Sequence, residues 1–424
     1  MKTKRNFAAE GIRLSYELIS GIIFMCETRT KNTYFTRIGN NKMTFKSIVV
    51  FMLNFVRKSL QLELDDFFGE IIDPNASVTK QAFSEARQKI SPTAFVKLSD
   101  TIIKWFYEDT HFKTFKGYRI LSVDGTILEV SNTENLRNEF GYTENKSMKL
   151  ARARASGLFD VENEMIITAV LGKYKANERT QAEELINKLE EIGFSNDLIL
   201  FDRGYPSKDL ICFMEKKKLK YLMRVSTSFK SFSNVKGEDQ IVEIKNNKEK
   251  LKVRVLKFDL DSGVTEILIT NIFDESFTVM DFKELYFKRW GIEVKYNELK
   301  NRLQIENFTG ETVIAINQDF YATVYLANMA TLVKMDADVI ISERNKDKDL
   351  KYEYKVNTNI LIGKLKNSLV CMLLEDNPTK RSKLLEKIIK RISDNIIPIR
   401  PGRSNPRRMR LRANKNSMNK KRAL

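Results

Sequence analysis

Two short apolar runs, each followed by an aspartate, constrain the fold of this chain most strongly. The run RILSV precedes Asp124, and the run DLILF precedes Asp202. Both runs are aliphatic and partly β-branched, so we expect buried strands that end near these two acids. A predicted helix at 178–194 lies between them. Strands that alternate with helices indicate an α/β layer, and side chains at the strand ends of such a layer converge on one site.

The chain outside these runs divides into regions of different pattern. Residues 155–174 are expected to form a hairpin that turns near Glu162 and Asn163, and residues 227–275 alternate like the strands of a β-rich insertion. The remaining expected elements are a strand at 220–226, helices at 281–303, 312–335, 358–374 and 379–394, and a charged linker at 342–355.

The N-terminal part of the chain is expected to be entirely helical. Residues 79–90 form an amphipathic helix, and a Ser-Pro pair that would start another helix follows it. Two helices around a short turn are typical of a helix-turn-helix element, in which 79–90 would read DNA through Lys80 and Arg87. An ordinary helical bundle is the alternative.

The charge balance points to a polyanion as a partner. The chain has 424 residues with 73 Lys+Arg and 55 Asp+Glu, and its formal net charge is +18. This excess indicates nucleic acid or an acidic membrane surface. The segment from Arg400 to the end contains ten cations and no acid. Such a tail either binds phosphates or keeps the chain soluble.

Several other classes of protein are disfavoured. No apolar run reaches the roughly 18 residues of a membrane-spanning helix, and the N-terminus lacks the pattern of a secretory signal. The cysteines Cys26, Cys212 and Cys371 are far apart, as expected for reduced thiols in a cytoplasmic protein. The single histidine, His111, leaves histidine-based triads and two-histidine zinc sites without partners. Metal chemistry would therefore use carboxylates and a hard ion such as Mg²⁺ or Mn²⁺.

One predicted helix carries an unusual set of polar side chains. In the stretch YFKRWGIEVKYNELK, the positions of Tyr286, Arg289, Glu293 and Lys300 fall within roughly 60° of one another on a helix. A charged stripe of this kind is often a solvated face with i,i+4 pairs. Trp290 and the glycine after it are poor choices for such a face, because good helix formers are favoured there.

Three carboxylates are candidates for one metal site. Asp124 and Asp202 follow strands, and Glu293 would arrive on the helix. Two metal ions about 4 Å apart can activate an oxygen nucleophile and offset charge on the leaving oxygen of a phosphodiester. Carboxylates that cluster without a metal repel one another and have raised pKa values, so stability alone does not explain such a cluster.

These residues resemble the Asp-Asp-Glu (DDE) transposases of the IS-four family of bacterial insertion sequences. The family signature is Tyr, two residues, Arg, three residues, Glu, six residues and Lys, which Tyr286, Arg289, Glu293 and Lys300 match without a gap. The motifs DGT at 124–126 and DRGY at 202–205 resemble the two aspartate motifs of the family. The likeness extends to ARASGLFDVENEM, VTKQAFSEARQKIS and RPGRSNPRR.

The resemblance implies a ribonuclease H-like mixed sheet flanked by helices and interrupted by a β-rich insertion. The expected segments are a helical DNA-binding domain (1–115), the first part of the catalytic core (116–226), the insertion (227–275), the rest of the core with the signature helix (276–340), C-terminal helices (341–399) and a basic tail (400–424).

The resemblance also implies metal-dependent cut-and-paste DNA transposition. Asp124, Asp202 and Glu293 would hold two Mg²⁺ ions, with Mn²⁺ as a substitute. Tyr286, Arg289 and Lys300 would contact phosphates near the transposon end. Trp290 would stack on a flipped base of a hairpin intermediate or pack in the core. The partners would be terminal inverted repeats, target DNA and a second copy of the chain in a synaptic dimer, with no membrane.

Two other functions stay open at this point. An inactive or domesticated relative would bind DNA without cutting it, although the three intact acids argue against this. A different ribonuclease H-like nuclease would cut DNA without transposition.

Overall fold

The structure is a computed structural model of the whole chain, and it describes residues 6–36, 43–54, 58–108, 112–193, 196–246, 249–260, 263–366 and 368–400. The chain forms two compact units. Unit 1 comprises Met1–Trp105, Leu128–Ala153 and Glu298–Leu424, and unit 2 comprises Phe106–Ile127 and Arg154–Asn297. Unit 1 therefore unites the N-terminal and C-terminal helical regions, which the sequence analysis treated as separate segments.

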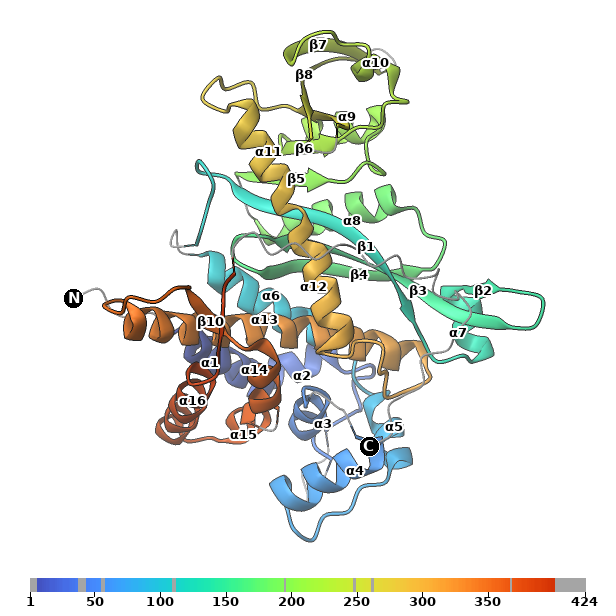
Figure 1. Cartoon of the computed structure of the whole chain (residues 1–424). Helices are drawn as coiled ribbons and strands as arrows, with labels where there is room; N and C mark the ends of the chain where they lie inside the picture. Colours follow the sequence, from blue (N-terminus) through green and yellow to red (C-terminus); the bar gives the residue numbers. More distant parts are fainter. Residues whose placement is uncertain are drawn as a thin grey trace. The chain divides into compact units, whose positions relative to one another are not determined.

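Unit 1 is mainly helical (Figure 1). Its N-terminal elements are α1 (Phe7–Ser20), α2 (Ile22–Thr28), α3 (Phe45–Met52), α4 (Leu60–Leu64) with its π-helical continuation η1 (Asp65–Ile72), α5 (Lys80–Arg87) and most of α6 (Thr93–Tyr107). Its other elements are α7 (Glu134–Phe140), β2 (Tyr142–Glu144), α13 (Val313–Asn345), β10 (Tyr354–Val356), α14 (Thr358–Leu365), α15 (Ser368–Leu374), α16 (Pro378–Ser393) and β11 (Ile396–Pro398).

The long helix α13 organises unit 1. It contacts α1, α14 and α16, and small residues such as Ala322, Ala327 and Ala330 are buried along it. A helix that is buried around most of its circumference lies inside a bundle rather than on its surface. The helix is longer than expected and includes the start of the predicted charged linker. Arg344 stays on its exposed side and pairs with Asp394 at 2.9 Å.

Unit 2 is a mixed sheet flanked by helices. Its strands are β1 (Arg119–Glu129), β3 (Lys149–Asp160), β4 (Met165–Lys173), β5 (Asp197–Phe201), β6 (Lys220–Arg224), β7 (Asp239–Asn246), β8 (Glu249–Asp259) and β9 (Thr265–Thr270), with the ends of β1 and β3 belonging to unit 1. The order is β3-β1-β5-β6-β9-β8-β7, and β4 pairs with β3. β1, β5 and β6 are parallel, whereas β9, β8 and β7 continue the sheet in antiparallel pairs.

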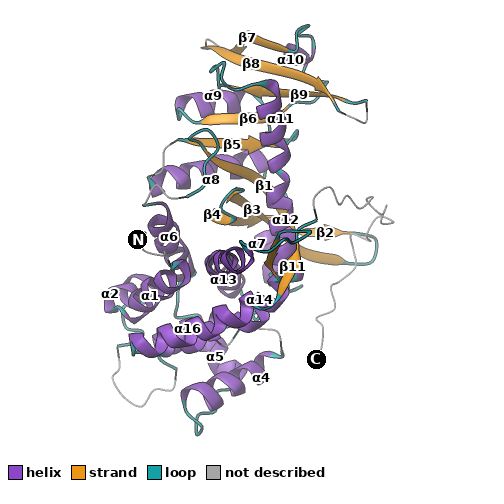
Figure 2. Ribbon diagram, turned by 60° about the vertical axis from the view of Figure 1, so that its left-hand side comes forward, coloured by secondary structure: helices purple, strands orange, loops and turns teal. Residues whose placement is uncertain are grey.

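Helices cover both faces of this sheet (Figure 2). α8 (Glu178–Ile192) and α9 (Lys208–Lys216) lie on one face, and α11 (Val279–Lys288) lies on the other, where α12 (Trp290–Asn301) follows it. The short α10 (Lys230–Ser233) precedes β7. A hydrophobic core joins α11 to the sheet through Phe282 and Leu285, which pack on Ile120, Leu198 and Leu200. Among the described residues, no helix is long and apolar enough to cross a membrane.

Two expectations about this unit need correction. β1 does not end near Asp124 but runs on to Glu129, because it also pairs with β3 after its parallel partner β5 has ended. The signature helix is also interrupted at Arg289, between α11 and α12. There the N–H groups of Arg289 and Ile292 bond to carbonyls three residues earlier, which tightens the turn.

Candidate active site

Asp124 lies in β1, and Asp202 lies at the matching position directly after the neighbouring strand β5. Ser122 of β1 pairs with Leu200 of β5, and each acid is two residues further along its own chain. Parallel neighbours lie about 4.8 Å apart, and side chains two residues apart point to the same face. Both carboxylates therefore lie on the face where Leu200 packs against α11.

The signature helices bring the other predicted residues to this face. The hydroxyl of Tyr286 donates to Oδ1 of Asp202 at 3.3 Å, and Nη2 of Arg289 donates to Oε1 of Glu293 at 3.1 Å. The hydroxyl of Ser122, two residues before Asp124, donates to the carbonyl of Arg289 at 3.4 Å. Residues far apart in the sequence therefore meet at one site in unit 2.

The electrostatics of the site follow from burial and from mutual repulsion. The pKa of Asp124 is raised to about 6, mainly by burial and also by the charges of Glu293 and Asp202. The N–H of Gly125 and the charge of Arg289 act in the opposite direction. Burial works to lower the pKa of Arg289, but Tyr286, Asp202 and Glu293 hold it above its ordinary value. Asp124 thus lies within electrostatic reach of both Glu293 and Asp202.

The carboxylate oxygens are suitable ligands for a divalent metal ion, because Mg²⁺ and Mn²⁺ prefer hard oxygen donors. Within the part of the chain that the structure describes, no group of three or more His, Cys, Asp or Glu is already arranged to hold a metal ion. The present partners of the acids differ: Gly125 N–H for Asp124, Tyr286 for Asp202 and Arg289 for Glu293. An incoming ion would have to share or replace these contacts.

A second layer of residues supports the two aspartate motifs, and the sequence analysis did not identify it. The hydroxyl of Tyr296 donates to the carbonyl of Asp124 at 2.7 Å. A Cβ atom at Gly125 would lie 3.1 Å from Oγ of Ser156, so the glycine permits a close approach of β1 to β3. Only the glycine in DGT signals this layer in the sequence.

The turn after Asp202 is held from α8. The guanidinium of Arg179 donates to the carbonyls of Gly204, Tyr205 and Pro206 at 3.1, 2.8 and 3.4 Å. These hydrogen bonds tie the backbone of the DRGYP segment to the first turn of α8. The polar residues at the start of a predicted helix gave no indication of this role.

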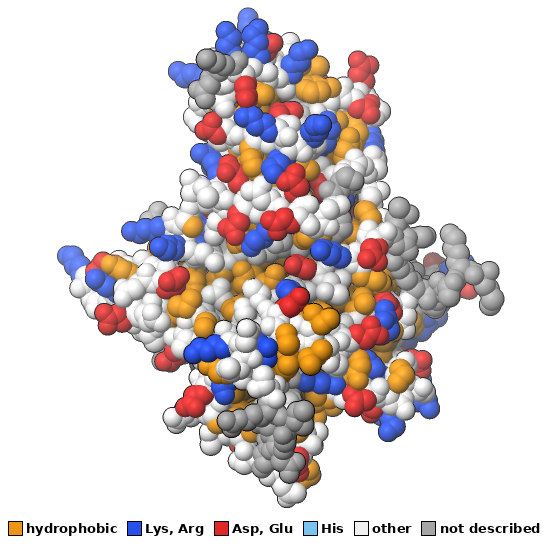
Figure 3. All heavy atoms as spheres, turned by 180° about the vertical axis from the view of Figure 1, so that it is seen from behind, with side chains coloured by type: hydrophobic (Ala, Val, Ile, Leu, Met, Phe, Trp, Pro, Cys, Tyr) orange, Lys and Arg blue, Asp and Glu red, His pale blue; other side chains and the backbone are white. Residues whose placement is uncertain are grey.

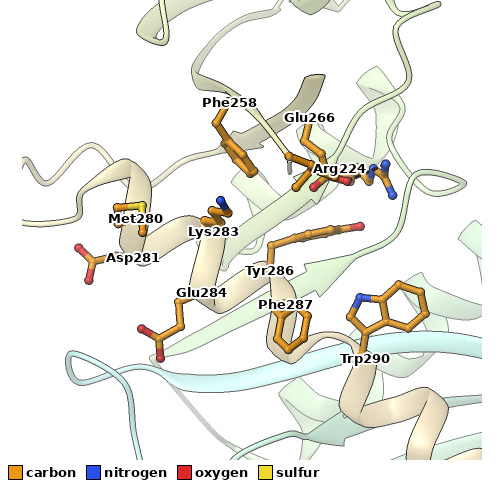
Figure 4. Close-up of a pocket in the computed structure, with 11 residues that line it drawn as sticks. Arg224, Phe258, Glu266, Met280, Asp281, Lys283, Glu284, Tyr286, Phe287 and Trp290 are labelled. Atoms are coloured by element: carbon orange, nitrogen blue, oxygen red, sulfur yellow. Dashed lines mark ion pairs between the residues drawn. The ribbon is translucent and has the colours of Figure 1, made fainter. Parts of the chain in front are cut away.

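A pocket of about 690 Å³ lies beside the site in unit 2. Its lining residues are Arg224, Phe258, Leu260, Glu266, Met280, Asp281, Lys283, Glu284, Tyr286, Phe287 and Trp290. Figure 4 shows the rings of Tyr286, Phe287 and Trp290 following one another along the helix, with the Arg224–Glu266 ion pair beside Tyr286. The guanidinium carbon of Arg289 lies 4.8 Å from the centre of the Trp290 ring. Trp290 therefore lines a pocket as well as packing on its neighbour.

Three predicted DNA contacts lie elsewhere. Lys300 is near the end of α12, 3.8 Å from Glu306. Lys80 is exposed on the first turn of α5. Arg87 is buried, and its guanidinium bonds to Gln318, Thr309, Asp319 and the carbonyl of Ala315. The expectation that Arg87 reads DNA is therefore wrong for this structure, because a fully enclosed guanidinium cannot reach a groove.

The charge of the chain is unevenly distributed along the sequence. Nine cations and no acids lie at 401–424, and this part of the predicted basic tail lies outside the described residues, as does His111. On the face seen in Figure 3, basic side chains are interspersed with acidic ones. Half of the net charge of +18 thus comes from the last 24 residues.

Half of the chain matches a known family of transposases. The family model described as "Transposase DDE domain" matches residues 115–329. Transposase InsG for insertion sequence element IS4 of Escherichia coli (strain K12) is 22% identical over 248 residues, which cover 55% of this chain and 55% of that protein. The chain thus matches about half the length of this curated relative.

A solved structure has a similar fold. It is a piggyBac transposase synaptic complex with hairpin DNA, determined by cryo-electron microscopy. The TM-score is 0.50 at 11% identity, and the match covers 93% of this chain and 87% of that chain. At this identity the likeness concerns the fold alone. Since the family model spans half of the chain and includes all three acids, the protein belongs to the transposase DDE domain family.

Proposed function

We propose that this protein is the DNA transposase of an insertion sequence. It binds terminal inverted repeats and cuts and rejoins DNA at them. The observation that carries this proposal is the meeting of Asp124 in β1 and Asp202 directly after the adjacent parallel strand β5 with Tyr286 and Glu293 from the signature helices. A ribonuclease H-like core, with residues 227–275 as its insertion, is the arrangement we propose for this catalytic part.

Asp124, Asp202 and Glu293 would hold two Mg²⁺ ions. When bound, the ions would activate the attacking oxygen and offset charge on the leaving oxygen of the phosphodiester. Water attacks the phosphorus at the transposon end, and the leaving oxygen becomes a free 3′-OH. This hydroxyl then attacks the opposite strand to close a hairpin, and after hairpin opening it attacks target DNA. The protein contributes positioning and fixed charges.

Other residues would hold the DNA. Tyr286 and Lys300 would contact phosphates near the cleavage site, and the exposed Lys80 would contact the repeat from α5. Arg289 is 3% exposed and pairs with Glu293, so it would orient this acid rather than reach a phosphate. Trp290 would stack on a flipped base, since the aromatic pocket that it lines has room for one. Two copies of the chain would hold two ends in a synaptic dimer. The reaction would take place in the bacterial cytoplasm.

The test is to incubate the purified protein with the DNA that flanks its own gene, with and without Mg²⁺, and to map the breaks. Cleavage at the repeat boundaries that requires the metal is expected. Asp124→Asn, Asp202→Asn and Glu293→Gln should each abolish it while binding of the ends persists. Asp209→Asn, which changes an exposed aspartate of α9, should leave it intact. Normal cleavage by any of the three site variants refutes the assignment.

A further inference from the structure

Three exposed cations lie on two backbone turns beside the active site, and the mechanism above gives them no role. Lys173 ends β4, Lys175 lies on the turn that leads to α8, and Arg203 directly follows Asp202 on the turn after β5. We call these three cations the basic rim. None of them forms an ion pair with another residue that the structure describes. Each can therefore bind a phosphate without first losing a partner.

The backbones of both turns are held by arginines of the same unit. Arg154 of β3 donates to the carbonyl of Tyr174, between the two lysines, at 3.3 Å. Arg179 of α8 donates to the three carbonyls at 204–206, directly after Arg203. The rim cations thus extend from a fixed backbone. Such preorganisation favours binding, because little backbone freedom is lost when a ligand is bound.

The local charge of the rim is positive. The segment 173–179 contains three cations and one acid, Glu178. Glu178 forms an ion pair with Arg154, so its charge is already offset. A Cβ atom at Gly204 would lie 3.9 Å from Oε2 of Glu178, so the turn that carries Arg203 approaches the same ion pair. The two turns therefore form one basic surface, which attracts a polyanion.

The turn after β5 connects the two faces of the sheet. The carboxylate of Asp202 points to the face of α11, where the hydroxyl of Tyr286 donates to it at 3.3 Å. The backbone that follows is held by Arg179 of α8, on the opposite face (Figure 2). The proposed function assigns the transposon end to the α11 face, through Tyr286 and the pocket that Trp290 lines. A duplex that crosses the carboxylates then has its other side over the rim.

We propose that the basic rim binds phosphates of the DNA beyond the reacting phosphodiester, which is flanking DNA before the cut and target DNA during strand transfer. This inference rests on the proposed function. Both kinds of DNA present the same chemistry, a backbone with one charge per roughly 1.7 Å of helix axis. Lysine and arginine contacts to phosphates position a duplex without reading its sequence. Each contact releases counterions, so binding weakens as salt rises.

Lys218 provides a matched control. It is exposed, forms no ion pair with another described residue, and lies on the turn before β6. Because β5 and β6 are parallel, this turn is at the opposite edge of the sheet from Arg203, which follows β5. Lys175→Gln, Arg203→Gln and Lys218→Gln each remove one exposed and unpaired charge. None of the three should lower the melting temperature.

The first measurement is the affinity of the full chain for fluorescent duplexes at several salt concentrations, without Mg²⁺ so that the DNA stays uncut. One duplex carries the repeat with its flanking DNA, and the other ends flush at the repeat. With the flanked duplex, Lys175→Gln and Arg203→Gln should each reduce the magnitude of the slope of log affinity against log salt by about 0.9, and the double variant by about 1.8. With the flush duplex, both should match the wild type. Lys218→Gln should match it with either duplex.

The second measurement separates target DNA from flanking DNA. Strand transfer of flush ends with Mg²⁺ is followed against the concentration of a target duplex of unrelated sequence. Lys175→Gln and Arg203→Gln should raise the KM for the target several-fold and leave kcat unchanged, because the rim binds DNA away from the reacting atoms. An effect in only one of the two measurements supports the rim and assigns it to that DNA alone.

Rim variants that match the wild type in both measurements overturn the inference. Equal weakening with the flush duplex also overturns it, because the rim would then hold the transposon end. If Lys218→Gln loses as much as the rim variants, the effect comes from total charge and the inference again fails. Cleavage at the repeats by a wild type whose rim variants bind normally leaves the proposed function intact. If the wild type makes no breaks at the repeats, the proposed function fails and the rim inference fails with it.

Discussion

Arg289 and Glu293 lie one helical turn apart, and their side chains form an ion pair at 3.1 Å. The side chain of Arg289 is 3% exposed, whereas that of Glu293 is 39% exposed. The arginine therefore holds the acid from the buried side. For the role proposed for Glu293, the spacing of four residues would place a cation beside the acid to orient it.

Replacing this arginine should impair the reaction more than the fold. We expect Arg289→Gln to lower the rate of Mg²⁺-dependent end cleavage by about a hundredfold, because small misplacements of a catalytic group have effects of this size. Gel analysis of cleavage, with melting temperature as the check on folding, measures this. Lys188→Gln is the control, since it breaks an exposed i,i+4 pair with Glu184. A wild-type rate in Arg289→Gln would remove the orienting role.

Arg87 and Lys80, both on α5, should behave in opposite ways. Arg87→Gln should lower the free energy of unfolding by about 3 kcal/mol, because removing one partner of a buried pair leaves the other, Asp319, without its opposite charge. Lys80→Gln should leave the free energy of unfolding unchanged.

Lys80 should instead affect DNA binding. If Lys80 contacts a phosphate, its loss should reduce the magnitude of the slope of log affinity against log salt by about 0.9. Urea unfolding and DNA binding at several salt concentrations measure both effects. An unchanged salt slope excludes Lys80 from the interface.

The contrast between these two residues shows that the sequence predicts a helix more readily than the burial of its side chains. Periodicity placed Lys80 and Arg87 on one polar face of a helix, and the helix is present. The partners of Arg87, however, lie 222 to 232 residues away, so no local pattern could indicate that the side chain is enclosed. The sequence predicted which residues share an element, but it could not predict what packs on that element.

The positions of the candidate site residues in the fold were more predictable, because these residues follow local signals. Asp202 comes directly after a buried strand, and Glu293 lies on a helix whose spacing is readable. The length of β1 was not predictable, since its second half depends on pairing with β3. The sequence placed Tyr205 in the DRGY motif but could not indicate that its hydroxyl is buried without a partner, because this depends on how the sheet packs.

The buried pair Arg119–Asp197 should show strong coupling. Nε of Arg119 lies 2.6 Å from Oδ1 of Asp197, and their side chains are 2% and 0% exposed. Burial raises the pKa of Asp197 in spite of the arginine. Arg119→Leu should cost about 3–5 kcal/mol in the free energy of unfolding, whereas Arg119→Leu with Asp197→Leu should recover most of this loss. Denaturant unfolding of the two single variants and the double variant measures the coupling. A double variant as unstable as Arg119→Leu contradicts the explanation.

The last prediction concerns pH and the N-terminal helix. Asp336 of α13 accepts hydrogen bonds from the N–H groups of Phe7 and Ala8 at 3.0 and 2.7 Å. It therefore caps α1. Burial raises the pKa of this carboxyl from 3.8 to about 6, although the two N–H donors act against the shift. Glu386 and Lys390 of α16 line the same pocket, so their charges also face it.

The direction of this pKa shift determines how the stability of the folded chain changes with pH. The folded chain holds the proton of Asp336 more tightly than the unfolded chain does, so its contribution to stability is full below pH 3.8 and is lost as pH rises through about 6. The shift of roughly two units corresponds to about 3 kcal/mol. Asp336→Asn cannot ionise, so its stability relative to the wild type should rise by about this amount between pH 4 and pH 7. Subtracting the two pH profiles removes the contributions of Glu386 and Lys390.

The control for this prediction is an aspartate with the opposite shift. The pKa of Asp376 is lowered, first by its hydrogen bond from Tyr16 and then by Lys46, and its side chain is 81% exposed. Asp376→Asn should therefore lose stability relative to the wild type as pH rises from about 3 to 5, and by a small amount. If the difference in stability between Asp336→Asn and the wild type does not change with pH, the pKa of Asp336 is not raised. The hydrogen bonds from the N–H groups of α1 would then have outweighed the burial of the carboxylate.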